Sequence, residues 1–229
     1  MVQLLDIGNS FTRIALWDGG DFCDLRRLPT CQLDKLPPVD FPQVAACVYP
    51  PAKEVLSKSD IVFISALNHR SKVDFSLVDC RTLGADRVAN AIAAAEFYRL
   101  PAAVIDCGTA VTLEVIDGHC RFVGGAIAPG RKLLRQALHN GTAQLPEIPL
   151  SEKMPSAIGR NTVDAISFGV DTGIVGSVRQ WLELLRRTYP ELTVILTGGD
   201  AGFLAPEFPE AVLADEFFTL HGIRLAGGF

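Results

Sequence analysis

Short apolar runs alternate with helical patterns along the whole chain. Residues 86–99 are Ala-rich, keep their apolar side chains on one side and stop before Pro101, which predicts a helix. Residues 161–189 show the same helical spacing with three glycines inside it, so a single long helix and a broken pair both remain open. Buried strands are predicted at the short apolar runs 61–64, 102–105 and 192–196. Strands alternating with helices predict an α/β protein.

One polar pattern occurs twice in the chain. Residues 5–12 read LDIGNSFT and residues 105–112 read IDCGTAVT, each an apolar run, then Asp-x-Gly-x-[Ser/Thr], then a second β-rich run. The offset is 100 residues, and it slips to 99 at the Asp-Gly pairs that follow both copies. Each copy predicts two strands joined by a tight turn. Unrelated hairpins are the alternative, but we interpret the match as a duplication with halves 1–100 and 101–229.

Two glycine-rich segments and a proline-rich one complete the pattern. Residues 194–201, VILTGGDA, predict a strand that runs into Gly-Gly and a helix start at Asp200, an arrangement that can contact nucleotides, although a structural turn is the alternative. Residues 124–132, GGAIAPGRK, predict a turn before a helix but lack the Lys-[Ser/Thr] of a P-loop. Six prolines, at 29, 37, 38, 42, 50 and 51, indicate a loop-rich insertion over residues 28–51.

Composition and charge exclude several classes of protein. The chain is 48% hydrophobic and 21% charged, which is typical of a folded domain. Twenty-one Lys and Arg against 26 Asp and Glu give a net charge of −5, so we expect no nucleic acid or membrane partner, and bound phosphate needs local donors or a metal ion. No apolar run reaches the roughly 18 residues of a membrane helix, and the N-terminus lacks a signal-peptide pattern, so we expect a cytoplasmic location.

The first hairpin suits phosphate and metal chemistry. Asp6 places a carboxylate at the end of a strand, Gly8 allows a ligand to approach the backbone, and Asn9 and Ser10 have short polar side chains. Such a turn can present amide N–H groups to phosphate and hold an acid beside a metal ion. An ordinary hairpin turn is the alternative. The second copy predicts a second phosphate-binding hairpin, facing the first across a cleft.

Six motifs in order resemble those of the type III pantothenate kinases. They are DIGNS at 6–10, GADR at 84–87, DCGTAVT at 106–112, GGAIAPG at 124–130, GRNT at 159–162 and TGGD at 197–200. This family belongs to the superfamily of acetate and sugar kinases, heat-shock ATPases and actin. The resemblance implies an α/β fold of two duplicated ribonuclease H-like domains with a central cleft. It also implies ATP-dependent phosphorylation of pantothenate to 4′-phosphopantothenate, the first step of coenzyme A biosynthesis.

The resemblance implies a nucleotide site and two cations. It assigns Asp106 to a monovalent cation, potassium or ammonium, and Thr109 to a nucleotide contact. Asp6 is expected near the magnesium ion that accompanies ATP, where the metal neutralises charge on the phosphates. The residues expected to bind the ATP phosphates are Asp6, Ile7, Gly8, Asn9, Ser10, Phe11, Thr12 and Arg13.

The resemblance also implies a substrate site, formed by Gly84, Ala85, Asp86, Arg87 and Thr162. By this resemblance Asp86 is expected to accept the proton of the pantothenate hydroxyl as the catalytic base, and the guanidinium of Arg87 is expected to engage the carboxylate. Thr162 is expected to contact pantothenate across a homodimer interface. The structural alternatives are helix caps, formed by Asp86 for one helix and by Asn161 with Thr162 for another.

One position departs from the family and keeps other functions open. Leu77 stands where the family often has an aromatic residue that contacts substrate. Two alternatives therefore remain beside the kinase. One is a nucleotide-binding accessory or regulatory protein without turnover, and the other is a related phosphotransferase that acts on another small alcohol.

Overall fold

The computed structural model describes residues 1–37, 39–56 and 60–229, which form two compact units. Pro38 of the predicted insertion lies outside the described residues. The first unit consists of Met1–Ala102, Glu114–Gly124 and Asp215–Phe229, and the second consists of Ala103–Leu113 and Gly125–Ala214. Strands β7 (Ala110–Ile116) and β8 (Phe122–Pro129) each begin in one unit and end in the other.

The first sheet has five strands in the order β3-β2-β1-β4-β5. Its strands are β1 (Val2–Ile7), β2 (Phe11–Trp17), β3 (Phe22–Pro29), β4 (Gln43–Cys47) and β5 (Ile61–Phe63). The first three strands pair antiparallel, and β4 and β5 are added in parallel beyond β1. Residues in β1 alternate between the two faces of the sheet, so the side chains of Leu5 and Ile7 enter one core while Asp6 lies on the opposite face.

The second sheet repeats this order. Its strands are β6 (Ala102–Cys107), β7 (Ala110–Ile116), β8 (Phe122–Pro129), β9 (Thr193–Thr197) and β10 (Val212–Leu213). Read from β8, the order β8-β7-β6-β9-β10 matches β3-β2-β1-β4-β5 strand for strand. The first three strands begin 100, 99 and 100 residues after their counterparts. The duplicated α/β fold predicted from the sequence is therefore confirmed.

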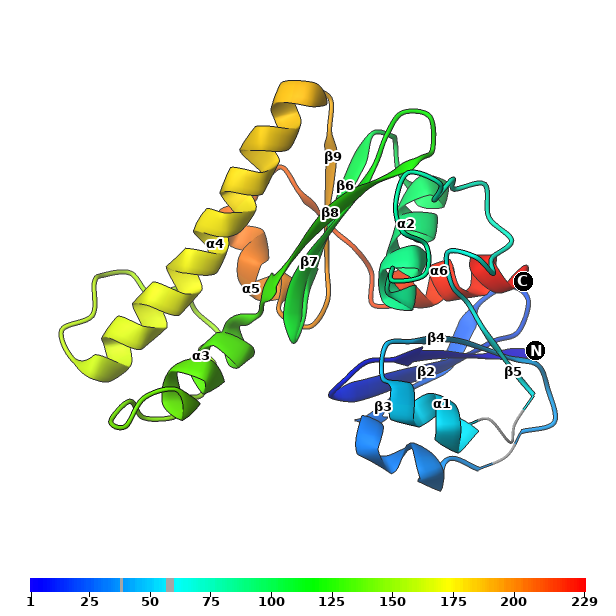
Figure 1. Ribbon diagram of the computed structural model, residues 1–229, viewed down its shortest axis with the longest axis horizontal. Helices are drawn as coiled ribbons and strands as arrows, with labels where there is room; N and C mark the ends of the chain where they lie inside the picture. Colours follow the sequence, from blue (N-terminus) through cyan, green and yellow to red (C-terminus); the bar gives the residue numbers. More distant parts are fainter. Residues whose placement is uncertain (38, 57–59) are drawn as a thin grey trace. The chain divides into compact units, whose positions relative to one another are not determined.

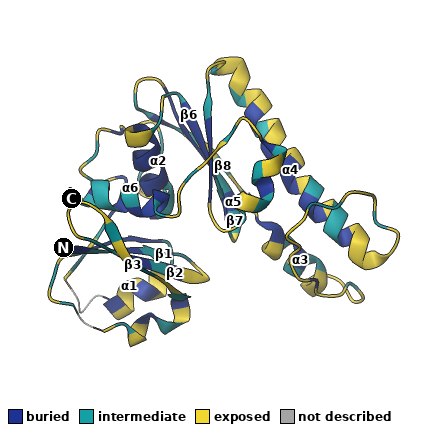
Figure 2. Cartoon of the chain, turned by 180° about the vertical axis from the view of Figure 1, so that it is seen from behind, coloured by how far each residue is buried: buried dark blue, intermediate teal, exposed yellow. Residues whose placement is uncertain are grey.

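Helices cover both faces of the first sheet (Figure 1). The 3₁₀ helix η1 (Thr30–Lys35) and α1 (Pro50–Leu56) pack on one face, where Leu33, Ala52 and Leu56 join the core cluster. The opposite face carries α2 (Ala85–Phe97) and α6 (Phe218–Gly227), which pack against each other and against β1 and β4. Figure 2 shows that most of α2 is buried.

The helices of the second unit include one long element. They are α3 (Arg131–Asn140), α4 (Thr162–Thr188), α5 (Ala201–Leu204) and the 3₁₀ helix η2 (Ala205–Glu207). Of the two possibilities for residues 161–189, a single helix of 27 residues is observed. Its buried stripe includes Ile166, Val170, Ile174 and Val178. Packing of this stripe outweighs the weak helix propensity of the three glycines.

Two sequence predictions are wrong. The supposed loop-rich insertion contains β4, which lies between β1 and β5 in the sheet. Its prolines flank the strand instead of interrupting it, and a flanking proline removes no hydrogen bond from the ladder. The segment predicted as a glycine-rich turn at 124–132 is mostly strand β8, and the turn to α3 is confined to Gly130. Among the described residues, no helix has the length and apolar character needed to cross a membrane.

Candidate functional site

The predicted phosphate-binding hairpin is a tight turn between β1 and β2. Gly8 N donates to Phe11 O at 3.1 Å, and the intervening Asn9 and Ser10 are exposed. Asp6, at the end of β1, stands opposite Arg13 in the antiparallel register. Side chains directly opposite in such a pair share one face of the sheet. The hairpin thus exposes its backbone while placing a carboxylate and a guanidinium on the same face.

The side chain and the amide of Thr30 stabilise this turn by hydrogen bonds. Its hydroxyl donates to Gly8 O at 2.8 Å and lies 3.1 Å from the Thr12 hydroxyl, and its amide donates to Ser10 O at 3.1 Å. Thr30 is only 3% exposed, so these bonds are shielded from water. No local pattern singles out Thr30, because 22 residues separate it from Gly8.

Helix α2 begins at the same end of the first sheet. Its N-cap is Gly84, where a Cβ would lie 3.5 Å from the Val48 side chain, and Val48 N donates to Ile7 O at 3.0 Å. The start of α2 therefore packs beside the carboxyl end of β1. This brings the GADR motif to the strand end that carries Asp6.

Asp86 lies inside the first turn of α2. The alternative that Asp86 is the N-cap of the helix is wrong, because the N-cap is Gly84, which has no side chain. One carboxylate oxygen of Asp86 accepts from Arg87 N at 2.7 Å. Burial raises the pKa of Asp86 above its usual range, and the hydrogen bond from the Arg87 amide opposes that rise in pKa only in part. A half-buried carboxylate with a raised pKa is suited to accept a proton.

Arg87 forms an ion pair that its motif does not predict. Its Nε donates to Glu114 Oε1 at 2.8 Å, where the Glu114 side chain is fully buried and that of Arg87 is 14% exposed. The guanidinium also lies 5.7 Å from the centre of the Phe122 ring. A signal was present in the sequence, since Glu114 is a lone acid within an apolar strand and such a residue needs a partner.

Three turns of the second unit approach one another closely. Gly198 has φ +91°, and a Cβ there would collide with the Asp106 carboxylate and lie 2.6 Å from Cys107 O. Asp200 N donates to Cys107 O at 2.8 Å. A Cβ at Gly130 would likewise overlap the backbone of the turn after β6. The motifs DCGT, APG and TGGD are therefore packed backbone against backbone, which only glycine permits at these two positions.

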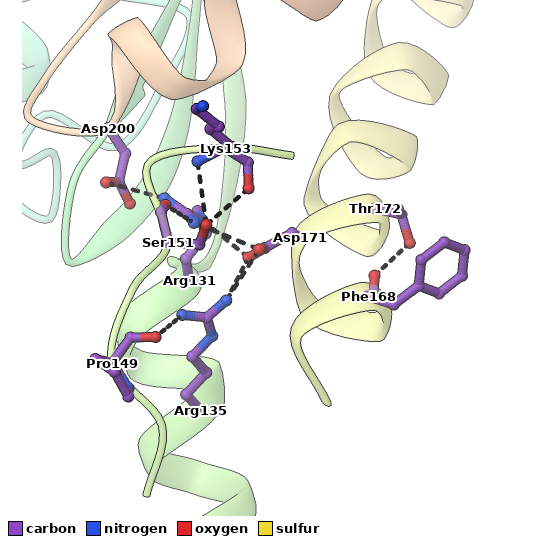
Figure 3. A network of polar contacts seen from close by, with 9 residues as sticks. All are labelled: Arg131, Arg135, Pro149, Ser151, Lys153, Phe168, Asp171, Thr172 and Asp200. Carbon is purple, nitrogen blue, oxygen red and sulfur yellow. Dashed lines mark hydrogen bonds and ion pairs between the residues drawn. The ribbon is translucent and has the colours of Figure 1, made fainter. Parts of the chain in front are cut away.

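A buried network of charges lies beside Asp200 of the TGGD turn (Figure 3). Asp171 of α4 accepts from Arg131 Nε at 2.9 Å and from Arg135 Nη2 at 2.9 Å, and all three side chains are at most 2% exposed. Arg131 also reaches Asp200 at 3.5 Å and stacks 3.3 Å from the centre of the Phe203 ring. Burial raises the pKa of Asp200, and Arg131 opposes that rise. The network thus joins α3, α4 and the TGGD turn.

Two further predicted residues are on the surface, whereas Ile7, Thr12 and Ala85 are buried. Thr109 is exposed in the turn between β6 and β7, and Thr162 is exposed at the first position of α4. The cap expected there is confirmed for Asn161, whose side chain accepts from Asp164 N at 3.0 Å. Leu77 is 55% exposed.

The chemistry of the carboxylates suits the expected cations. Magnesium in kinases is usually held by one or two carboxylates together with substrate phosphates, and Asp6 beside the exposed turn provides one. The Asp106 carboxylate and Cys107 O lie together beside Gly198 and are the hard oxygen donors that a potassium ion prefers. Among residues 1–37, 39–56 and 60–229, no cluster of three or more His, Cys, Asp and Glu residues could hold a metal ion unaided.

Comparisons with known proteins agree on one family. A family model described as type III pantothenate kinase matches residues 43–183. A type III pantothenate kinase of Methylacidiphilum infernorum is 31% identical over 98% of this chain and 87% of its own length. Another, of Exiguobacterium sibiricum, is 36% identical over 83% of this chain and 72% of its own.

Solved structures share the fold. One described as a Baf family transcriptional activator from Campylobacter jejuni has a TM-score of 0.68 at 23% identity and covers 97% of this chain and 95% of its own. The activator of 2-hydroxyisocaproyl-CoA dehydratase from Clostridium difficile, with bound ADPNP, has a TM-score of 0.55 at 16% identity, over 98% of this chain and 92% of its own.

Proposed function

The chain belongs to the type III pantothenate kinase family and phosphorylates pantothenate with ATP and a divalent metal ion, and from this premise we propose how its residues serve the reaction. The observation that carries the proposal is Asp86, a half-buried carboxylate with a raised pKa in the first turn of α2, at the strand end that carries Asp6. The product is 4′-phosphopantothenate, and the reaction is the first step of coenzyme A biosynthesis.

Asp86 accepts the proton of the substrate hydroxyl in this proposal. As the hydroxyl oxygen bonds to the γ-phosphorus of ATP, the bond from that phosphorus to the β–γ bridging oxygen breaks and ADP leaves. The hydroxyl proton passes to the Asp86 carboxylate. Because burial disfavours the ionised form of Asp86, the carboxylate is more basic than one in water and accepts the proton more readily.

Arg87 binds the carboxylate of pantothenate, and Glu114 orients it. A guanidinium has five N–H donors in a rigid fork, so a bond from Nε to Glu114 is compatible with a second carboxylate on the same group. The fully buried Glu114 fixes the plane of the guanidinium before substrate arrives. Such preorganisation lowers the entropic cost of binding.

The hairpin Asp6–Arg13 and Thr109 contact ATP, with Asp6 beside the magnesium ion. The metal ion, when bound, neutralises charge on the phosphates. Asp106 and Cys107 O hold a monovalent cation, potassium or ammonium, which is supported by their position beside Gly198. Exposed Thr162 contacts the substrate of a second subunit, so the active enzyme is a homodimer, and we assign it to the cytoplasm.

A kinase assay tests the function. ADP release is coupled to NADH oxidation in the presence of ATP, magnesium and potassium, with pantothenate, acetate or a sugar as acceptor. We expect turnover with pantothenate and none above background with the other acceptors. Similar rates on all acceptors would favour a different phosphotransferase, and no turnover with any acceptor would favour an accessory protein. Replacing potassium with sodium tests the monovalent site, where we expect a lower rate.

The Thr30 hydroxyl supports the phosphate hairpin, so Thr30→Val should weaken ATP binding. Valine has nearly the same shape but removes the hydroxyl that donates to Gly8 O, and the loss of such a hydrogen bond costs about 0.5–1.5 kcal/mol. We expect a severalfold higher KM for ATP, an unchanged KM for pantothenate and a lower free energy of unfolding. Thr30→Ser keeps the hydroxyl and should restore the KM for ATP. An unchanged KM for ATP in Thr30→Val would contradict a role of Thr30 in the hairpin.

A further inference from the structure

A second cation lies in the same cross-strand row as Asp6 and Arg13. In the antiparallel register Asp6 stands opposite Arg13, and Arg13 stands opposite Arg27 of β3. Directly opposite residues share a face, so these three side chains emerge on the side of the sheet that α2 and α6 cover. One of these helices, α2, has Asp86 in its first turn. Arg27 therefore lies on the side of the first unit where the chemistry is proposed.

Arg27 is held in place by an aromatic ring. Its guanidinium carbon lies 3.9 Å from the centre of the Phe11 ring, and Phe11 is the first residue of β2 after the phosphate turn. Stacking on a ring face occupies the plane of the guanidinium and directs its N–H groups sideways. The ring is 41% exposed, so the stacked pair reaches the surface beside the turn.

Charge on this row is not balanced by the protein. Among the described residues neither Arg13 nor Arg27 forms an ion pair, whereas Arg26, the neighbour of Arg27, pairs with Asp24 at 2.6 Å. Asp6 is the one acidic residue of the three-residue row, so the row has a net charge of +1. A guanidinium that has no acidic partner and lies beside a phosphate-binding turn favours an anionic ligand.

We propose that Arg27 is a phosphate-binding residue, which contacts the triphosphate of ATP from β3 beside Arg13. The proposal rests on the assignment of the Asp6–Arg13 hairpin to the ATP phosphates. It adds a contact from a third strand, 14 residues beyond Arg13 in the sequence. Arg27 is held by Phe11 and binds the phosphates through N–H groups that point away from the ring.

Arg27→Gln should weaken binding of the triphosphate alone. Calorimetry with the non-hydrolysable analogue AMPPNP and magnesium, without pantothenate, should show a Kd about tenfold higher than in the wild type, as expected for loss of one charged hydrogen bond. Adenosine binding should stay unchanged, because it has no phosphate. Arg27→Lys should recover part of the affinity. In the kinase assay the KM for ATP should rise while the KM for pantothenate does not.

Arg26→Gln is the matched control, because Arg26 directly precedes Arg27 on the same strand and points to the other face. It should leave the Kd for AMPPNP within twofold of the wild type. Equal Kd values for Arg26→Gln and Arg27→Gln would overturn the proposal. Arg27 would then only pack against the Phe11 ring. A parallel loss of adenosine binding would also overturn it. A wild type that binds AMPPNP but does not phosphorylate pantothenate would contradict the proposed function and leave this test intact.

Discussion

Asp86→Asn should reduce kcat by about two to four orders of magnitude, the usual contribution of a general base. Asparagine keeps the shape of the side chain and can still accept the 2.7 Å hydrogen bond from Arg87 N, but it cannot take a proton. KM for ATP should change little, because Asp86 is assigned to the acceptor hydroxyl. Steady-state kinetics at saturating ATP and pantothenate measure the effect. Asp79→Asn, at an exposed turn residue of the same unit, is the control and should retain wild-type kcat.

The pH dependence of kcat/KM is a second test of Asp86 as the general base. A general base must be ionised, and burial raises the pKa of Asp86, so kcat/KM should fall as the pH is lowered through that raised pKa. This acid limb should lie above the value of about 4 that is usual for aspartate. The residual activity of Asp86→Asn should lack the limb. A wild-type rate that stays flat down to pH 4 would rule out Asp86 as the proton acceptor.

Stability should change in the opposite direction to activity. A carboxyl group whose pKa is higher in the folded than in the unfolded state is destabilising when ionised, and that penalty is fully present above the folded pKa and is relieved as the pH falls through it. Asparagine carries no charge, so Asp86→Asn should be at least as stable as the wild type at neutral pH. The difference in free energy of unfolding should shrink toward acid pH. A marked loss of stability in the variant would mean that the lower kcat reflects misfolding.

Local patterns in the sequence predicted the parts of the fold that local interactions determine. The Asp-x-Gly turns at Gly8 and Gly108 close hairpins between adjacent strands, so each pattern and its structure lie within a few residues. The helix before Pro101 was predicted for the same reason. Strand β4 was missed because the surrounding prolines suggested a loop, although residues 44–47 form a continuous apolar run and prolines are expected at strand ends, not inside them.

Side-chain partners far apart in the sequence could not be predicted from spacing. Thr30 and Gly8 are 22 residues apart, and Arg87 and Glu114 are 27 residues apart. Nothing local in the chain indicates such a pairing, which depends on which strands become neighbours. The sequence does indicate which residues need a partner. A lone acid such as Asp171 on the apolar stripe of a helix must be neutralised or hydrogen-bonded when it is buried.

Removing the charge of Asp171 should destabilise the protein strongly. This carboxylate is fully buried and accepts from two guanidinium groups, Arg131 and Arg135, which are 2% and 1% exposed. Asp171→Asn leaves both cations buried and turns an NH₂ group toward groups that can only donate. Breaking a buried ion pair from one side costs about 3–5 kcal/mol. Chemical denaturation followed by circular dichroism should show a loss of this size in the free energy of unfolding.

Glu210→Gln is the matched control. Glu210 pairs with Arg186 of the same long helix at 2.8 Å, but both side chains are more than 40% exposed. Water solvates both groups when the pair is broken, so the expected loss is below about 1 kcal/mol. Equal losses in Asp171→Asn and Glu210→Gln would contradict the view that burial makes the Asp171 network sensitive.

A double variant separates the cost of the unpaired charge from that of lost packing. Arg135→Met removes one of the two cations and fills its space with an apolar chain, so in combination with Asp171→Asn it should be less destabilising than the sum of the single changes. Additive losses would mean that packing, not charge, dominates. The double variant keeps Arg131, which also contacts Asp200, so the TGGD turn should keep its position.

Asp200→Asn as a single change should cost less stability than Asp171→Asn. Asp200 is 22% exposed and accepts from only one of the two arginines.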